Sequence, residues 1–153
     1  MIKLYEPKLE DLWFKEKLLG DKKTMSYNHA YGGTISFPRE KWDIWYDKWI
    51  INHENYRYFR YIKLYNIFIG ECAYHYDFEK NIYLVDIIID NEYRNNGYGK
   101  LALKMLCDIA KSSGIKTLYD EIAIDNPSIN MFLKSGFEKV LETNEYILIK
   151  KDL

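Results

Sequence analysis

Residues Tyr93 to Lys100 read Tyr-Arg-Asn-Asn-Gly-Tyr-Gly-Lys, and this segment is the most informative one in the chain. The apolar run Ile82 to Asp90 precedes it and predicts a strand, and the amphipathic run Leu101 to Lys111 follows it and predicts a helix. Backbone N–H groups at the start of a helix have no partner within the helix, and the helix dipole favours negative charge there. The segment therefore predicts a phosphate-binding loop.

Spacing weakens the case for a nucleotide-binding P-loop. The P-loop pattern is G-x-x-x-x-G-K-[ST], in which the last hydroxyl holds a magnesium ion. Here Leu101 follows Lys100 in place of that hydroxyl, and no glycine stands at the first position of the pattern.

A dinucleotide-binding fingerprint, G-x-G-x-x-A, fits Gly97, Gly99 and Ala102, with Asp120 and Glu121 farther along the chain. The turn before Gly97 is longer than this fingerprint needs. Too little chain follows to complete the paired βαβαβ halves. This interpretation, and that of a glycine-containing turn without a ligand, remain as alternatives.

A third pattern, R-x-x-G-x-G/A, fits every position from Arg94 to Gly99. The stretch from Ile87 to Tyr93 before it, and the stretch from Asp125 through Gly136-Phe137 after it, agree with the same family in order and spacing. In these segments, and in the order of elements over nearly its whole length, the chain resembles the GNAT superfamily of N-acetyltransferases. In that family the loop binds the pyrophosphate of coenzyme A.

The resemblance implies a mixed α/β (α+β) fold in a single domain spanning residues 1–153. Its centre would be a mostly antiparallel twisted sheet of about seven strands, splayed in the middle and flanked by about four helices. Apolar periodicity and turn residues predict the same elements along the chain. Strands are expected at residues 1–5, 56–64, 67–76, 82–89, 117–124, 137–141 and 146–150, and helices at 7–19, from 38 onward, at 101–111 and from 127 to before Gly136.

The resemblance also implies which residues bind acetyl-CoA, the expected acetyl donor. Backbone groups of the strand before the loop would bond the pantetheine arm and the thioester oxygen, and backbone N–H groups of the loop would hold the pyrophosphate. Arg94 and Lys100 would add positive charge. The residues concerned are Ile87, Ile88, Ile89, Arg94, Asn95, Asn96, Gly97, Tyr98, Gly99 and Lys100.

Two residues after the next strand complete the implied donor site. Asn126 would reach the amide groups of the arm, and it can also cap the helix expected at Pro127. Phe132 stands where many relatives carry a tyrosine that protonates the leaving thiolate, so that hydroxyl is absent here. A thiol has a pKa of about 8.5, which makes its thiolate a fair leaving group without such an acid. Tyr119 is a weak substitute.

Asp86 is the leading candidate for the base that takes a proton from the acceptor amine. It interrupts the apolar run from Ile82 to Ile89, and a carboxylate there needs either a structural or a catalytic reason. Glu71 on the preceding strand is the second candidate, and a histidine, His29 or His75, could also serve.

The acceptor wall is expected in the glycine-containing loop that holds Tyr27, Asn28 and His29. A second helix carries a stripe of aromatic residues at helical spacing, and this stripe is expected to pack in the core first and to line a pocket second. The stripe contains Trp42, Trp45, Tyr46, Trp49 and Ile50.

Composition excludes several classes of protein. A net charge of −1 argues against a nucleic-acid-binding protein that works through basic charge. Cys72 and Cys107 lack metal-ligand spacing and are expected to be buried thiols, and no metal site is predicted. The N-terminus carries charges too early for a secretory signal, and no run of ~18 apolar residues predicts a membrane span. A cytoplasmic protein without a membrane or nucleic-acid partner is expected.

Taken together, these features predict an acetyl-CoA-dependent N-acetyltransferase in which the amine attacks the thioester directly within a ternary complex. The alternative is a non-catalytic acyl-CoA-binding or regulatory module. The acceptor, a small-molecule amine or an amine of a peptide or protein, is not identified by the sequence. A homodimer is also left open.

Overall fold

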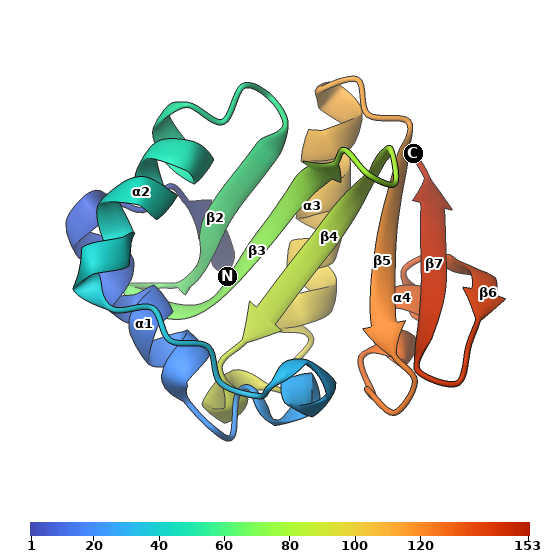
Figure 1. Cartoon of the computed structure of the whole chain (residues 1–153), viewed down its shortest axis with the longest axis horizontal. Helices are drawn as coiled ribbons and strands as arrows, with labels where there is room; N and C mark the ends of the chain where they lie inside the picture. The colour runs from blue at the N-terminus through green and yellow to red at the C-terminus, as the bar shows by residue number, and fades with distance from the viewer.

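The computed structural model describes the backbone of residues 1–153 and every side chain except those of residues 30 and 31. Seven strands form one sheet in the order β1-β2-β3-β4-β5-β7-β6, with helices on both faces (Figure 1). Every neighbouring pair is antiparallel except β4 and β5, which are parallel. The strands are β1 Ile2–Tyr5, β2 Arg57–Leu64, β3 Ile67–Asp77, β4 Ile82–Ile89, β5 Thr117–Ala123, β6 Glu138–Glu142 and β7 Tyr146–Asp152.

The four α-helices are α1 Leu12–Gly20, α2 Trp42–Tyr46, α3 Tyr98–Ser112 and α4 Ile129–Lys134. Short 3₁₀ turns are η1 Leu9–Asp11, η2 Ser26–Tyr31, η3 Arg39–Lys41 and η5 Asn91–Tyr93, and η4 Asp47–Ile51 is a π-helical turn. The predicted mixed α/β fold, its seven-stranded sheet and its four helices are confirmed.

Helix boundaries differ from the sequence-based ranges for local reasons. Helix α3 begins at Tyr98 instead of Leu101, because Gly97 adopts a left-handed conformation (φ 81°) and turns the chain into the helix at once. Helix α4 begins at Ile129 instead of Pro127, because the Asn126 side chain accepts a hydrogen bond from the backbone N–H of Ser128 and forms a turn first.

The aromatic helix after Pro38 is not a uniform α-helix. It passes from η3 through α2 into η4, where the backbone N–H of Asn52 donates to the carbonyl of Asp47, five residues back. Because this turn is wider, the side chains after α2 point in other directions than they would in a continuous α-helix. Trp49 lies in the π turn, and its ring packs against Phe59 of β2 and His75 of β3.

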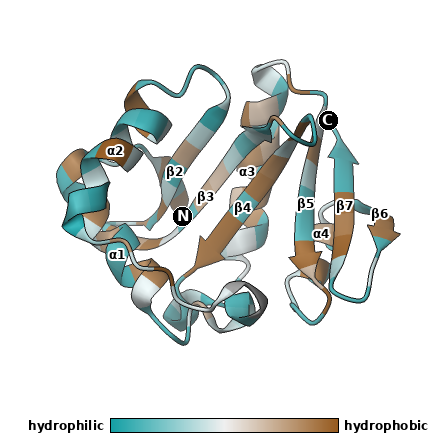
Figure 2. Cartoon of the chain, in the orientation of Figure 1, coloured by the Kyte–Doolittle hydropathy of each residue, from teal (hydrophilic) through white to brown (hydrophobic). Residues whose placement is uncertain are grey.

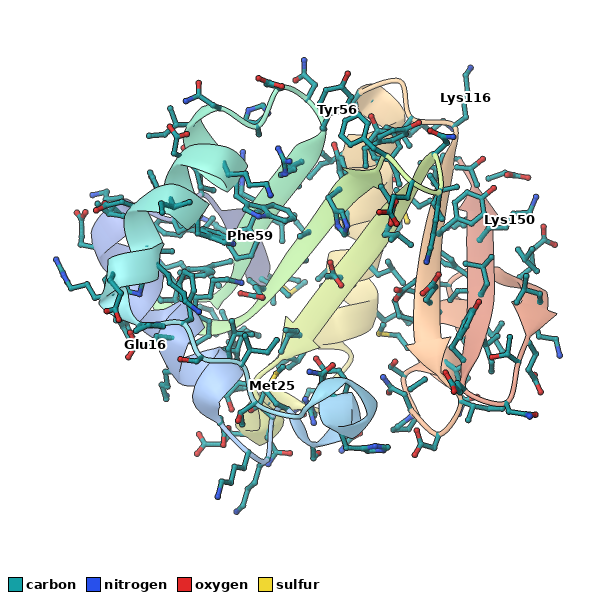
Figure 3. The ribbon with its side chains drawn as sticks, viewed as in Figure 1. Glu16, Met25, Tyr56, Phe59, Lys116 and Lys150 are labelled. Carbon is teal, nitrogen blue, oxygen red and sulfur yellow. The ribbon has the colours of Figure 1, made fainter. Side chains whose placement is uncertain are left out.

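Two apolar cores lie on opposite faces of the sheet, and β4 between them is apolar along most of its length (Figure 2). One core packs α3 against β3, β4 and β5. The other packs α1 and α2 against β2 and β3, with Phe59 between the sheet and these helices (Figure 3). Cys72 and Cys107 are both buried free thiols, as predicted. None of the described helices is long and apolar enough to cross a membrane.

Candidate active site

The sheet opens between β4 and β5. These strands pair only near their starts, at their second and third residues, Tyr83 with Leu118 and Leu84 with Tyr119. Beyond that point they separate, and Figure 1 shows the gap widening toward the ends of both arrows. The later residues of β4 therefore have backbone groups without a β5 partner, which could bond an extended ligand placed between the strands.

The pairing of β4 with β3 shows which backbone groups face this opening. The backbone N–H of Asp90 donates to the carbonyl of Ile69, and the ladder alternates from there. Ile87 and Ile89 thus direct their N–H and C=O groups away from β3. Ile88 does not: its carbonyl oxygen faces β3, where a Cβ on Gly70 would lie only 2.3 Å from it. Of the three predicted isoleucines, two have backbone groups available to a ligand.

The loop after β4 has the form of an anion-binding loop. Asn95 and Gly97 have left-handed backbones, with φ of 65° and 81°, and the Asn96 side chain donates to the carbonyls of Tyr93 and Arg94. Among the described residues, none accepts a hydrogen bond from the backbone N–H groups of residues 95–100. These free donors stand at the start of a 15-residue helix, whose dipole adds positive potential.

A depression of about 470 Å³ lies directly beside this loop. Four lysines surround it, so its charge matches a ligand with several phosphates. Its lining residues are Gly97, Lys100, Leu101, Leu103, Lys104, Cys107, Asp108, Lys134, Ser135 and Lys151. The free N–H groups, the lysines and the glycines together fit the phosphates of coenzyme A. Lys100 is exposed and lines this depression, whereas Tyr98 is half-buried and packs on the core.

Arg94 has a different place from the one predicted. Its Nε donates to the carbonyl of Ile89 at 3.1 Å, and its Nη2 donates to the carbonyl of Thr24. The guanidinium also lies over the ring of Tyr27, 5.4 Å from its centroid. The side chain therefore links the end of β4 to the segment before η2, and its charge lies beside Tyr27 of the predicted acceptor loop.

Asp86 lies on the face of β4 that carries α1 and α2, beside His75 of β3. Its Oδ2 is 3.7 Å from Nδ1 of His75, and 62% of its side chain is exposed. Solvent reaches the carboxylate, yet the surrounding protein partly dehydrates it. Burial therefore raises the pKa of Asp86, while the nearby His75 and Lys15 oppose that shift. A carboxylate with these properties can accept a proton from a ligand on this face.

Glu71, the second predicted base, is engaged in a buried ion pair. Its carboxylate accepts hydrogen bonds from Lys15 Nζ at 2.9 and 3.1 Å, and both side chains are less than a tenth exposed. The ammonium also lies 4.8 Å from the ring centroid of Phe59 and 4.9 Å from that of Trp45. Burial raises the pKa of Glu71, and Lys15 opposes the shift. This arrangement gives Glu71 a structural role beside the site.

Lys15→Met is expected to destabilise the fold by about 3–5 kcal/mol, because it leaves the Glu71 carboxylate buried without a partner. A group whose pKa is higher in the folded than in the unfolded protein stabilises the fold at low pH. This contribution is lost as the pH rises through the folded-state pKa. Loss of Lys15 raises the pKa of Glu71 further, so the destabilisation should be larger at about pH 8 than at about pH 5. Urea unfolding at both values measures it.

The double variant Lys15→Met/Glu71→Gln is the control for this prediction. Removing both charges should recover most of the lost free energy, because no unpaired charge remains buried. An equal loss in the single and double variants would show that packing of the lysine stem, and not the ion pair, provides the stability.

The predicted acceptor segment forms η2 and reaches the far side of the opening. His29 Nε2 lies 2.8 Å from Oδ2 of Asp125, which follows β5, and both side chains are 60% exposed. The Asn28 side chain donates to the carbonyl of Gly33 and shapes the loop itself. Tyr27 is half-buried, and burial raises its pKa. Of these three side chains, Tyr27 is the one held beside Arg94.

Asn126 and Phe132 have structural contacts. Asn126 caps the turn before α4 through its side-chain oxygen. Phe132 is 3% exposed and packs edge-on against Phe137, with 5.1 Å between the ring centroids. The ring therefore belongs to the core beneath α4. Neither contact prevents a backbone or amide contact to a ligand nearby.

Sequence reasoning missed Lys15 and Asp120 as members of the site. Burial raises the pKa of Asp120 well above its usual range, and Asp86 across the opening adds to the shift. Nothing in the local sequence marks Lys15, because its partner Glu71 is 56 residues away along the chain. Asp120 could have been noticed as a carboxylate within a predicted apolar strand, the signal that identified Asp86. Among the described residues, no group of three or more His, Cys, Asp or Glu side chains could hold a metal ion.

The family model for the acetyltransferase (GNAT) family matches residues 22–137. The chain therefore belongs to the GNAT acetyltransferase family. No curated protein matches the sequence closely enough to count as a relative.

Several solved structures share the fold at low sequence identity. A GNAT-family acetyltransferase from Streptococcus pneumoniae superposes with a TM-score of 0.80 at 19% identity, covering 100% of both chains. Spermidine N-acetyltransferase from Vibrio cholerae, solved with CoA and spermine, gives 0.80 at 16% identity, covering 99% of this chain and 95% of that one. Microcin C7 self-immunity acetyltransferase, solved with acetyl-CoA and AMP, gives 0.77 at 16% identity, covering 99% and 92%.

Proposed function

We propose that this protein transfers an acetyl group from acetyl-CoA to a primary amine. The proposal rests on one observation: the opening between β4 and β5 adjoins the loop that follows β4. The opening between β4 and β5 leads from the backbone groups of Ile87 and the N–H of Ile89 to the free N–H groups of residues 95–100. The carbonyl of Ile89 accepts from Arg94 and is not available. An extended arm that ends in phosphates matches that path in shape and in charge.

On the donor side the chain binds and orients. The loop from Asn95 to Lys100 and the start of α3 hold the phosphates, and the lysines beside them hold the remaining negative charge. The backbone groups of Ile87 and the N–H of Ile89 align the arm along β4. Acetyl-CoA, when bound, supplies an activated acetyl group and a thiol leaving group. Holding both substrates in one orientation provides much of the rate.

On the acceptor side Asp86 holds the proton that the amine must lose. A primary ammonium has a pKa of about 10, so it is protonated near neutral pH and cannot attack until it gives up that proton. The Asp86 carboxylate is exposed on the face where Tyr27 and Trp49 lie. Its negative charge favours a cationic acceptor over an anionic one.

The similar solved structures support an amine acceptor without identifying it. One similar structure is named for spermidine, a small-molecule amine. The exposed carboxylate of Asp86 and the aromatic ring of Trp49 suit a small cationic amine for the same physical reason, because both attract positive charge. We therefore place small cationic amines before peptide or protein amines as acceptors.

An amine panel with acetyl-CoA tests this function. The panel contains a diamine, a polyamine, an amino acid, an amino sugar and a peptide with a free N-terminus. With at least one amine we expect thiol release faster than the hydrolysis of acetyl-CoA measured without amine. That amine should gain the mass of one acetyl group. Release that does not depend on any amine would contradict the proposal.

A further inference from the structure

His75 lies beside the proposed base, Asp86. It stands opposite Leu84 in the β3–β4 register, one diagonal position from Asp86 on the same face. Its Nδ1 lies 3.7 Å from Asp86 Oδ2, somewhat too far for a hydrogen bond. Nδ1 is also buried and has no hydrogen-bond partner among the described residues. A buried ring nitrogen without a partner is costly, so its direction toward a carboxylate needs a reason.

The ring of His75 is held in place from the other side. Trp49 packs against it edge-on, with 5.8 Å between the ring centroids and 68° between the planes. Trp49 belongs to the π-helical turn η4, a feature frequent at functional sites. The guanidinium of Arg57 on β2 lies over the Trp49 ring, 6.0 Å from the ring centroid. The imidazole is therefore fixed with Nδ1 toward Asp86, while 31% of its side chain stays exposed.

Solvation of Asp86 does not require His75 Nδ1 to point toward its carboxylate. Its carboxylate is exposed and could be solvated without a histidine. A carboxylate base must be held in a fixed direction and must be ionised near neutral pH. A neighbouring imidazole can hold the carboxylate and, when protonated, favours its ionised form.

We propose that His75 is the positioning residue of the acceptor-side base, and that His75 and Asp86 act together as one proton-accepting pair. This inference rests on the proposed function. As the acceptor enters, Nδ1 and Oδ2 close to hydrogen-bond distance. Asp86 takes the proton from the ammonium: the N–H bond breaks, an O–H bond forms, and the electron pair stays on the amine nitrogen. His75 holds the carboxylate in that direction, and the proton later leaves to solvent.

Other charged groups surround the pair and act on its ionisation. Lys15 of α1 and its ion-pair partner Glu71 of β3 lie on the same face of the sheet, Asp120 of β5 also interacts with the charge of Asp86, and Arg57 flanks Trp49. Lys15 and His75 both lower the pKa of Asp86 against the effect of burial. Removal of the His75 charge should therefore raise the pH at which Asp86 becomes ionised.

Nuclear magnetic resonance of the histidine rings tests the pair without any turnover. The chain has three histidines, so ring signals from labelled protein can be assigned with single His→Asn variants. In Asp86→Asn we expect the ring signals of His75 to change position at a fixed pH, because the carboxylate 3.7 Å from Nδ1 is replaced by a neutral amide. The ring signals of His29 and His53 should stay in place. Unchanged His75 signals would overturn the inference.

Two substitutions at His75 separate its hydrogen bond from its charge. His75→Asn keeps an N–H donor at the place of Nδ1, and His75→Leu removes both functions. We expect both to move the acidic limb of the kcat/KM profile to higher pH. Only His75→Leu should lower the plateau, by about tenfold, because only there does Asp86 lose its hydrogen-bond partner. An acidic limb that stays in place in both variants would overturn the inference.

The response of Tm to coenzyme A shows whether the His75 variants fold and bind the donor, independently of their activity. Both variants should keep the wild-type rise in Tm with coenzyme A, since His75 lies outside the phosphate loop. If the wild type releases no thiol with any amine, the proposed function fails, and the ring signals of His75 in Asp86→Asn still show whether the two side chains interact. If the wild type turns over and the acidic limb does not move in the variants, only the role of His75 fails.

Discussion

Gly97→Trp is expected to abolish the stabilisation that coenzyme A gives to the wild-type protein. A ligand at about 100 times its Kd should stabilise the wild type by about 2.7 kcal/mol. For a chain of this size that corresponds to a rise in Tm of about 5–10 °C. Gly97 lines the depression beside α3, and its Cβ position is open, so an indole there would fill the space for the phosphates. Thermal unfolding with and without coenzyme A measures the loss.

Gly114→Trp is the matched control for this result. Gly97 and Gly114 flank the two ends of α3, with φ of 81° and 88°, and at both a Cβ would meet nothing within 4 Å. Both substitutions should therefore cost about 1 kcal/mol of backbone strain. Only the one at position 97 should remove the response to coenzyme A. A wild-type response in Gly97→Trp would contradict the assignment of the donor site.

Asp86→Asn is expected to lower kcat/KM by about a hundredfold or more while leaving the binding of coenzyme A unchanged. The amide keeps the size of the side chain and cannot take a proton. Since burial raises the pKa of Asp86, wild-type activity should fall as the pH drops through that raised value. The variant should lack this acidic limb. Initial rates of thiol release over a range of pH measure both effects.

Asp43→Asn is the control for the charge change alone. Asp43 is exposed on α2, away from β4, and its substitution alters the net charge by the same amount. We expect wild-type rates and a wild-type pH profile. If Asp86→Asn also retained the acidic limb, the base would have to be another group, with Asp120 the next carboxylate across the opening.

The parts of the fold that depend on local sequence could be predicted. Alternating and continuous apolar runs predicted all seven strands, because strand periodicity is set within each segment. The loop at Arg94 to Gly99 could be interpreted because glycines at a helix start have a direct physical meaning. The resemblance to GNAT proteins predicted the splay, which appears as two paired residues per strand between β4 and β5.

The contacts that shape the site depend on tertiary structure, and no local pattern encodes them. Arg94 was expected at the phosphates because of its position in the loop, yet its donors bond to Ile89 and to Thr24, a residue 70 positions earlier. Glu71 was expected as a possible base, and its buried bond to Lys15 gives it another role. Phe132 was placed at the donor by analogy, and its ring lies in the core.

Thiol release from acetyl-CoA by the wild-type protein in the presence of amines tests acetyl transfer itself. We expect release that depends on an amine, saturates with its concentration, and leaves an equal amount of acetylated amine. Stabilisation by acetyl-CoA with no amine-dependent release across the whole panel would contradict it. That result would instead support a module that binds acyl-CoA without catalysis.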